Sequence, residues 1–142
     1  MHRILALAVA FSSITLSSAF AHHPLGGEVP QTMLHGFLSG VGHPVIGFDH
    51  FAFVVAIGLI AAFHKQRVIM PVGFVLGTMA GTLMTISAIV LPFAELVITA
   101  SVILAGVIAM RGKHTSIAPM TMGAAVIGLF HGWAYGGAVI GA

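Results

Sequence analysis

The chain has no cysteine, few charges and little that could cover the surface of a water-soluble fold. The absence of cysteine from its 142 residues excludes disulfides, thiolate metal sites and thiol nucleophiles. Only 6% of the residues are charged, against about a quarter in an average soluble domain. A lipid bilayer removes the need for surface charge, because lipid tails accept an apolar exterior. With 58% hydrophobic residues, the composition indicates one membrane domain of a few helices.

The N-terminus has the pattern of a secretory signal peptide. A short basic segment precedes an apolar stretch, and Ala19-Phe20-Ala21 then places small residues where a signal peptidase reads them. We expect cleavage after Ala21, with residues 1–21 as signal peptide and residues 22–142 as the mature domain; a retained first membrane helix is the alternative. Cleavage would leave His22 and His23 beside a free α-amine, which could capture metal outside the cytoplasm or form only a polar tail.

Apolar runs in the mature chain predict an all-α, polytopic membrane helix bundle. About four runs are long enough for a span of about 20 residues. They cover about 44–63, 68–91, 93–110 and 117–140. The stretch from Met33 to Phe63 is too long for one span, so we divide it at His43-Pro44. A short interfacial or re-entrant helix therefore precedes the first span.

The basic residues predict the orientation of these spans. If the mature N-terminus lies outside, Lys65, Arg67, Arg111 and Lys113 all fall on the cytoplasmic side, as the positive-inside tendency requires. The turn around Pro92 carries no basic residue and falls outside. We therefore expect a protein of the bacterial cytoplasmic (inner) membrane, surrounded by the lipid bilayer.

Two of the predicted spans carry glycine at every fourth position. Such spacing lets helix backbones approach closely in lipid, although space for a permeating ion is an alternative. The glycines are Gly73, Gly77, Gly81, Gly128, Gly132 and Gly136. Thr78, Thr82 and Thr85 share one face of the second span, where we expect hydrogen bonds to another helix.

Ionisable side chains inside the predicted spans are the candidate functional residues, because each costs several kcal/mol in a membrane unless it is paired or bound. Asp49 and His50 lie in the first span, Glu95 begins the third, and His131 lies within the fourth. Neither lysine nor arginine occurs in these spans to neutralise the acids, so protonation or a bound cation must do so. Glu95 would also suit the positive end of a helix dipole.

The segment from His43 to His50 reads His-Pro-Val-Ile-Gly-Phe-Asp-His. In a regular helix its two histidines would share a face but lie about 10 Å apart along the axis. A metal ion with bonds of about 2 Å cannot bridge that distance. Either the backbone is non-helical around Pro44, or the histidines serve successive sites. Asp49 could also orient a histidine without binding metal itself.

This segment resembles the HupE/UreJ family of nickel and cobalt permeases. The family pattern is a His-Pro, two residues, Gly, one residue and Asp-His, shortly after a His-Gly. His35-Gly36, Gly40 and the segment from His43 to His50 fit it, and Phe130-His131-Gly132 resembles a later His-Gly segment. Glu95 stands where the family has a glutamate that opens a helix.

The resemblance implies import of nickel or cobalt for urease, hydrogenase or another metalloenzyme, with the ion as cargo and no tightly bound cofactor. It also implies that His43, Asp49 and His50 contact the metal, with His35 and His131 as further candidates. Imidazole and carboxylate ligands suit nickel, cobalt and zinc.

Three features depart from the family pattern. Trp133 and Tyr135 stand where the family often has more histidines, and Gly137-Ala138-Val139 replaces an expected glutamate. The sequence ends at Ala142, where family members usually continue with more helix. It is therefore a truncated reading or a short form that must oligomerise, as a homo-oligomer, to enclose a path.

The sequence thus predicts a secondary metal transporter. It predicts neither an enzyme nor a nucleic-acid-binding protein. A Gly-rich nucleotide loop is absent, so a gradient or the membrane potential would drive transport. One alternative is a haem-binding or electron-transfer membrane subunit, since histidines on separate spans can ligate haem iron. Another is a small structural membrane protein whose glycine faces are its purpose.

Overall fold

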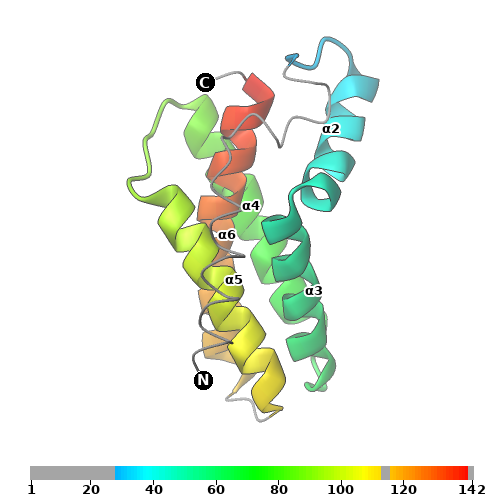
Figure 1. The fold of residues 1–142 in the computed structure, drawn as a ribbon, viewed down its shortest axis with the longest axis vertical. Helices are drawn as coiled ribbons and strands as arrows, with labels where there is room; N and C mark the ends of the chain where they lie inside the picture. Colours follow the sequence, from blue (N-terminus) through cyan, green and yellow to red (C-terminus); the bar gives the residue numbers. More distant parts are fainter. Residues whose placement is uncertain (1–27, 113–115, 141–142) are drawn as a thin grey trace, which may run out of the picture.

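The computed structural model describes residues 28–112 and 116–140, and within these ranges every regular element is an α-helix. The helices are α2 (Met33–Ile46), α3 (Phe48–Ala62), α4 (Ile69–Ile86), α5 (Ala94–Arg111) and α6 (Ile117–Ile140) (Figure 1). The predicted all-α class is confirmed. The expected signal peptide, together with His22 and His23, lies outside the described residues.

Three helices are long and apolar enough to cross a membrane alone, namely α4, α5 and residues Ile117–Gly137 of α6. α3 has 15 residues, which gives it a length of about 22 Å, less than the roughly 30 Å of a bilayer core. It joins α2 at an angle of 80°, and this bent pair is either a broken span or a re-entrant loop. The helical membrane bundle is therefore supported, while the number of spans stays a prediction.

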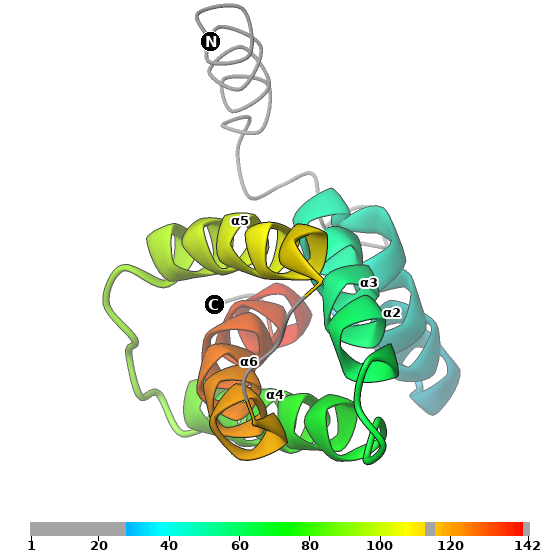
Figure 2. The same ribbon diagram turned by 90° about the horizontal axis from the view of Figure 1, so that it is seen from below.

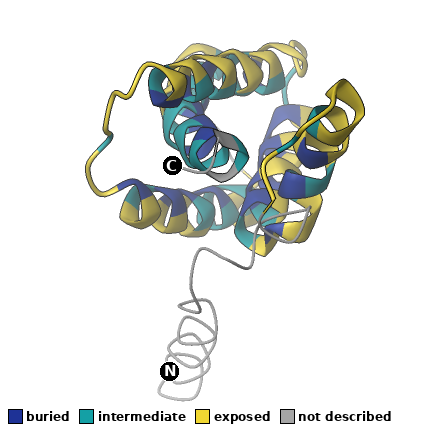
Figure 3. Cartoon of the chain, turned by 90° about the horizontal axis from the view of Figure 1, so that it is seen from above, coloured by how far each residue is buried: buried dark blue, intermediate teal, exposed yellow. Residues whose placement is uncertain are grey.

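Large apolar side chains face outward from the bundle. Leu76 on α4, Leu96 on α5 and Met122 on α6 are all strongly exposed. Seen from above, exposed residues follow the outer faces of the helices, and buried residues face the interior (Figure 3). An apolar surface of this extent would be costly in water and suits lipid.

The chain breaks between α2 and α3 at Gly47, later than the predicted division at His43-Pro44. α2 continues through Pro44 and runs on to Ile46, so the proline does not end the helix. Gly47 then adopts an extended conformation with φ −71° and ψ 98°. Its N–H donates to the carbonyl of His43, and its own carbonyl accepts from the N–H of Phe51, both at 2.8 Å. These bonds satisfy the helix ends at the break.

The glycine-rich faces of α4 and α6 pack against each other, as the close-packing interpretation predicts. A Cβ on Gly77 would overlap the carbonyl oxygen of Ala125, and one on Gly132 would overlap that of Thr78. Seen from below, α6 lies between α4 and α5 (Figure 2). Thr82 donates to the carbonyl of Gly132 at 3.0 Å. Hydrogen bonds between helices in lipid contribute about 0.6 kcal/mol each.

Two of the three predicted threonines hydrogen-bond across this interface. Thr85 donates to the carbonyl of Trp133 at 2.8 Å, and Thr82 bonds to α6 as described. Thr78 instead donates to the carbonyl of Val75 in its own helix at 2.7 Å. Its own backbone carbonyl is the group that touches Gly132, so the close approach is made by the main chain there.

The basic connections lie at one end of the bundle. The α3–α4 connection, with Lys65 and Arg67, and the end of α5, with Arg111, share the lower end in Figure 1. The α4–α5 connection, residues 87–93, lies toward the opposite end. This arrangement agrees with the predicted gathering of positive charge on one side. Lys113 and His114 lie outside the described residues.

Candidate metal site

Three buried histidines from α2, α3 and α6 come together inside the bundle. His43, His50 and His131 have exposed fractions of 4%, 9% and 2%. The ring centroids of His43 and His50 are 4.7 Å apart, as are those of His50 and His131. The rings therefore run in order with His50 in the middle, and we call them the histidine series.

The break at Gly47 allows the first two rings to meet. A straight helix would separate His43 and His50 by about 10 Å along its axis, whereas α2 and α3 join at 80°. The backbone between the histidines is non-helical at Gly47, and not around Pro44 as one of the two sequence-based alternatives required. A Cβ on Gly47 would lie 3.0 Å from the carbonyl oxygen of His43 and 3.4 Å from Nδ1 of His50. Glycine therefore leaves the space that this junction requires.

Asp49 binds the neighbouring histidine. Its Oδ1 lies 2.9 Å from Nδ1 of His50 and accepts a hydrogen bond from the backbone N–H of His50, also at 2.9 Å. When Nδ1 carries the hydrogen of this bond, the lone pair of the neutral ring is on Nε2. Carboxylates orient metal-binding histidines in this way. The carboxylate also places a negative charge beside the histidine series.

Two aromatic rings and one hydroxyl hold His131. The ring of Phe53 stacks on it at 4.6 Å with an interplanar angle of 29°, and Phe74 meets it edge-on at 5.6 Å. The hydroxyl oxygen of Ser101 on α5 lies 3.2 Å from Nε2 of His131. Phe53, Phe74 and Ser101 are not among the candidates that the sequence indicates. A phenylalanine or a serine in an apolar run is usually ordinary packing, so only the fold identifies them.

A cavity of about 580 Å³ lies beside the histidine series, between α2, α3, α4 and α6. Besides the three histidines, its polar lining residues are Thr78, Thr82 and Tyr135. The ring of Tyr135 lies 5.1 Å from that of His43. Tyr135, which departs from the family pattern in the sequence, is therefore part of the cavity wall. We call this space the histidine cavity.

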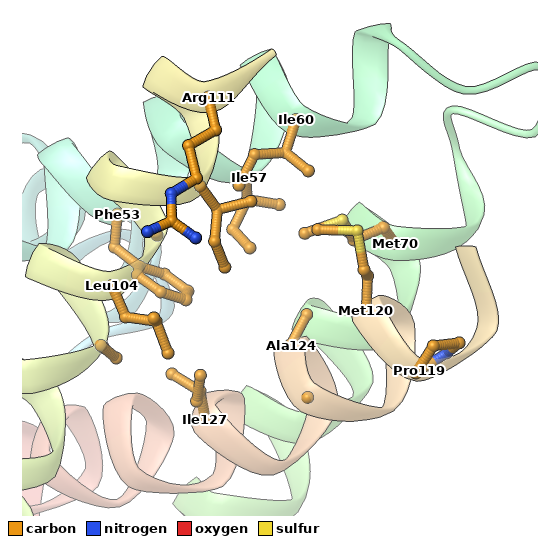
Figure 4. Close-up of a pocket in the computed structure, with 14 residues that line it drawn as sticks. Phe53, Ile57, Ile60, Met70, Leu104, Arg111, Pro119, Met120, Ala124 and Ile127 are labelled. Carbon is orange, nitrogen blue, oxygen red and sulfur yellow. The ribbon is translucent and has the colours of Figure 1, made fainter. Parts of the chain in front are cut away.

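A second cavity of about 360 Å³ lies between α3, α5, α6 and the first turn of α4. Figure 4 shows Arg111 pointing into it among apolar side chains such as Leu104 and Ile57. We call it the arginine cavity. Phe53 and Ser101 line the arginine cavity, and both contact His131, which lines the histidine cavity. The boundary between the two cavities is therefore formed at His131.

Two candidate residues lie away from this site. His35 is exposed on α2, two turns before His43, which corresponds to about 12 Å along the helix. Glu95 is exposed in the first turn of α5, a position that suits the helix dipole. Neither lines the histidine cavity.

The histidine series is not arranged as one closed coordination site. Across residues 28–112 and 116–140, no three histidine, aspartate or glutamate side chains are placed to hold one metal ion together. The rings meet edge to face, at 82° for His43 with His50 and 74° for His50 with His131. This geometry could bind a cation between His43 and His50 or between His50 and His131, but not between all three rings at once.

Comparison with known proteins gives one family match. The family model described as HupE / UreJ protein matches residues 8–142. The chain is also 34% identical over 105 residues to Protein HupE of Rhizobium leguminosarum bv. viciae, a match that covers 71% of this chain and 54% of that protein. The chain thus spans about half the length of the curated relative it matches. No solved structure matches it.

The motif residues and the helical bundle agree with this match. The HupE/UreJ family is one of metal transporters and not of enzymes, and it is generally associated with nickel or cobalt transport for hydrogenase or urease. The family model covers nearly the whole sequence. The chain belongs to the HupE/UreJ family.

Proposed function

We propose that this protein carries a divalent transition-metal ion, nickel or cobalt, across the bacterial cytoplasmic membrane as a secondary transporter. The observation that carries the proposal is the series of buried imidazoles, His43, His50 and His131, beside a cavity of about 580 Å³. Buried polar groups in a membrane are expensive. A cation that binds them in turn offsets that cost, and membership of a metal-transporter family supports the same conclusion.

The chemistry of the donors suits the proposed ions. Imidazole binds nickel, cobalt and zinc well, whereas copper(I) favours the thiolate and thioether ligands that are absent from this series. Asp49 supplies a negative charge next to His50 and, in this proposal, acts mainly by orienting it. A site of two imidazoles at a time would bind an ion loosely enough to release it, as transport requires.

The proposed route follows the two cavities. The ion enters the histidine cavity, passes along the histidine series to His131, and leaves through the arginine cavity at the end that carries the basic connections. The positive charge of Arg111 would weaken any binding of the cation there, so the arginine cavity would not retain the ion. If the basic end faces the cytoplasm, a membrane potential of 100 mV would contribute about 5 kcal/mol for a doubly charged ion.

Residues outside the histidine cavity would assist the approach of the ion. Cleavage after Ala21 would place His22 and His23 on the outer side, where they would capture metal before it enters the histidine cavity. His35, exposed on the first helix, would serve the same approach, and Glu95 would attract cations near the outer end of α5. In this proposal lipid surrounds the bundle. A homo-oligomer would enclose the path of the ion more completely. Nickel enzymes would receive the ion in the cell.

The alternative of a haem-binding subunit fits the geometry less well. Axial ligands of one haem iron lie on opposite faces of a porphyrin. Here the ring of His50 touches those of both His43 and His131, with centroids at 4.7 Å, so a porphyrin has no place between either pair. The purely structural alternative explains the glycine faces but gives no reason for imidazoles in the interior.

Uptake of labelled nickel and cobalt by cells tests the proposal. We expect His50→Ala to lower uptake by at least about tenfold, since loss of a ligand or of its orienting partner costs metal sites that much or more. Met122→Ala, on the exposed face of α6, is the control and should behave as wild type. Both proteins must be quantified in the membrane. Equal uptake by His50→Ala and wild type, above cells without the protein, would exclude the histidine series from transport.

A further inference from the structure

Ser101 is not part of the histidine series, but its hydroxyl contacts the ring of His131. It is 4% exposed and sits in the middle of α5, facing His131 on α6. Its hydroxyl oxygen lies 2.7 Å from the carbonyl oxygen of Ile98 and 3.2 Å from Nε2 of His131. Both contacts are within hydrogen-bond distance.

The first of these contacts fixes the direction of the second. A carbonyl oxygen can only accept a hydrogen bond, and a serine hydroxyl has a single hydrogen to donate. At 2.7 Å that hydrogen must point to Ile98, because two oxygen lone pairs would otherwise repel each other. The oxygen of Ser101 can then only accept from His131, so the hydrogen of the neutral imidazole must be on Nε2.

The other ring nitrogen of His131 is left with the lone pair. Nδ1 is buried and has no hydrogen-bond partner in the described part of the chain. A buried acceptor without a partner costs about 1–3 kcal/mol. Stacking by Phe53 and edge contact by Phe74 hold the ring plane, which opposes rotation of Nε2 away from Ser101.

We propose that Ser101 is a positioning residue that holds His131 in the tautomer whose Nδ1 binds the transported ion. The inference rests on the proposed function for the identity of that ion. It also gives His50 and His131 opposite tautomers. Asp49 occupies Nδ1 of His50 and directs Nε2 to the cation, whereas Ser101 occupies Nε2 of His131 and directs Nδ1. Two different partners would thus fix which ring nitrogen of each histidine binds the ion.

Nitrogen NMR of the metal-free protein tests the tautomer directly. The protein is labelled with ¹⁵N-histidine, placed in lipid bilayers at a pH where imidazoles are neutral, and His131 is assigned by the signals lost in His131→Asn. We expect a protonated Nε2 and an unprotonated Nδ1 in wild type. Ser101→Ala should lose this preference, while Ser101→Thr, which keeps the hydroxyl, should retain it. Thr99→Ala, an exposed hydroxyl on the same helix, is the matched control.

Nickel titration of the same purified proteins tests the consequence. We expect Ser101→Ala to bind nickel about tenfold or more weakly than wild type, with Ser101→Thr and Thr99→Ala close to wild type. A wild-type His131 protonated on Nδ1, or an unchanged tautomer and nickel affinity in Ser101→Ala, would overturn the inference. Because the NMR measurement needs no metal, failure of nickel transport and failure of the Ser101 role give different results.

Discussion

Gly47 is the residue on which the meeting of His43 and His50 depends. It ends α2 and begins α3, and its carbonyl and N–H both take part in the hydrogen bonds of the break. A side chain there would press on the carbonyl oxygen of His43 at 3.0 Å and would lie 3.4 Å from Oδ1 of Asp49 and Nδ1 of His50. The arrangement of the histidine series therefore depends on a residue that has no metal-binding side chain.

We expect Gly47→Ala to reduce nickel uptake by about tenfold or more while the protein still reaches the membrane, because the added Cβ would lie 3.0 Å from the carbonyl of His43 and displace the two rings. Gly58→Ala is the matched control. It lies on α3, and a Cβ there meets nothing within 4 Å. Uptake and membrane abundance are measured together. Normal uptake by Gly47→Ala would mean that the spacing of the two histidines does not matter.

Functional residues could be predicted from the sequence only where the free-energy cost of placing them in a membrane is high. His43, Asp49, His50 and His131 stand out, because imidazoles and carboxylates need a reason to lie in apolar runs. Ser101 does not, since a serine in a helix can satisfy itself on its own backbone, as it does with Ile98. Its second contact, to His131, depends on how α5 and α6 pack, which local sequence does not determine.

At the level of the helices, α4 and α6 form the closest pair. Glycines on each helix remove the side chains that would hold the backbones apart, and threonines of α4 donate to carbonyls of α6. α6 carries His131, and α4 carries Phe74, which packs against it. The glycine interface therefore sets where His131 stands relative to the other histidines.

Gly132→Ala should destabilise the bundle by about 1–3 kcal/mol, because its Cβ would overlap the backbone carbonyl of Thr78. Gly123→Ala on the same helix meets nothing within 4 Å and should be neutral or slightly stabilising, since alanine favours a helix over glycine. Unfolding in detergent by denaturant titration measures the difference. Equal stability of the two variants would show that α4 and α6 do not pack at this interface.

Apolar runs predict helices over about 68–91, 93–110 and 117–140, because lipid-exposed helices need long uninterrupted apolar stretches. α4, α5 and α6 overlap these ranges, and α4 ends at Ile86, before the end of the first run. The break between α2 and α3 is harder to place. Pro44 is the stronger breaking signal in the sequence, yet α2 runs through it to Ile46, and Gly47 makes the turn. The bend of 80° is a tertiary feature that neither residue encodes alone.

At the scale of the whole molecule, His131 links the two cavities, because it lines the histidine cavity and contacts Phe53 and Ser101 of the arginine cavity. The histidine cavity is lined by the imidazoles, and the arginine cavity is largely apolar with Arg111 at the end that carries the basic connections. The positions of the basic residues in the sequence predict that their connections share one end of the bundle. The cavities could not be predicted from the sequence, since each is lined by residues from helices far apart in the chain.

X-ray absorption at the nickel edge, on purified protein loaded with nickel in lipid, tests the central claim most directly. We predict imidazole nitrogens in the first coordination shell of wild type and their loss in a protein carrying His43→Ala, His50→Ala and His131→Ala. Circular dichroism would verify that both proteins keep their helices. A first shell of oxygen alone, identical in both proteins, would contradict the claim that these buried histidines bind the ion.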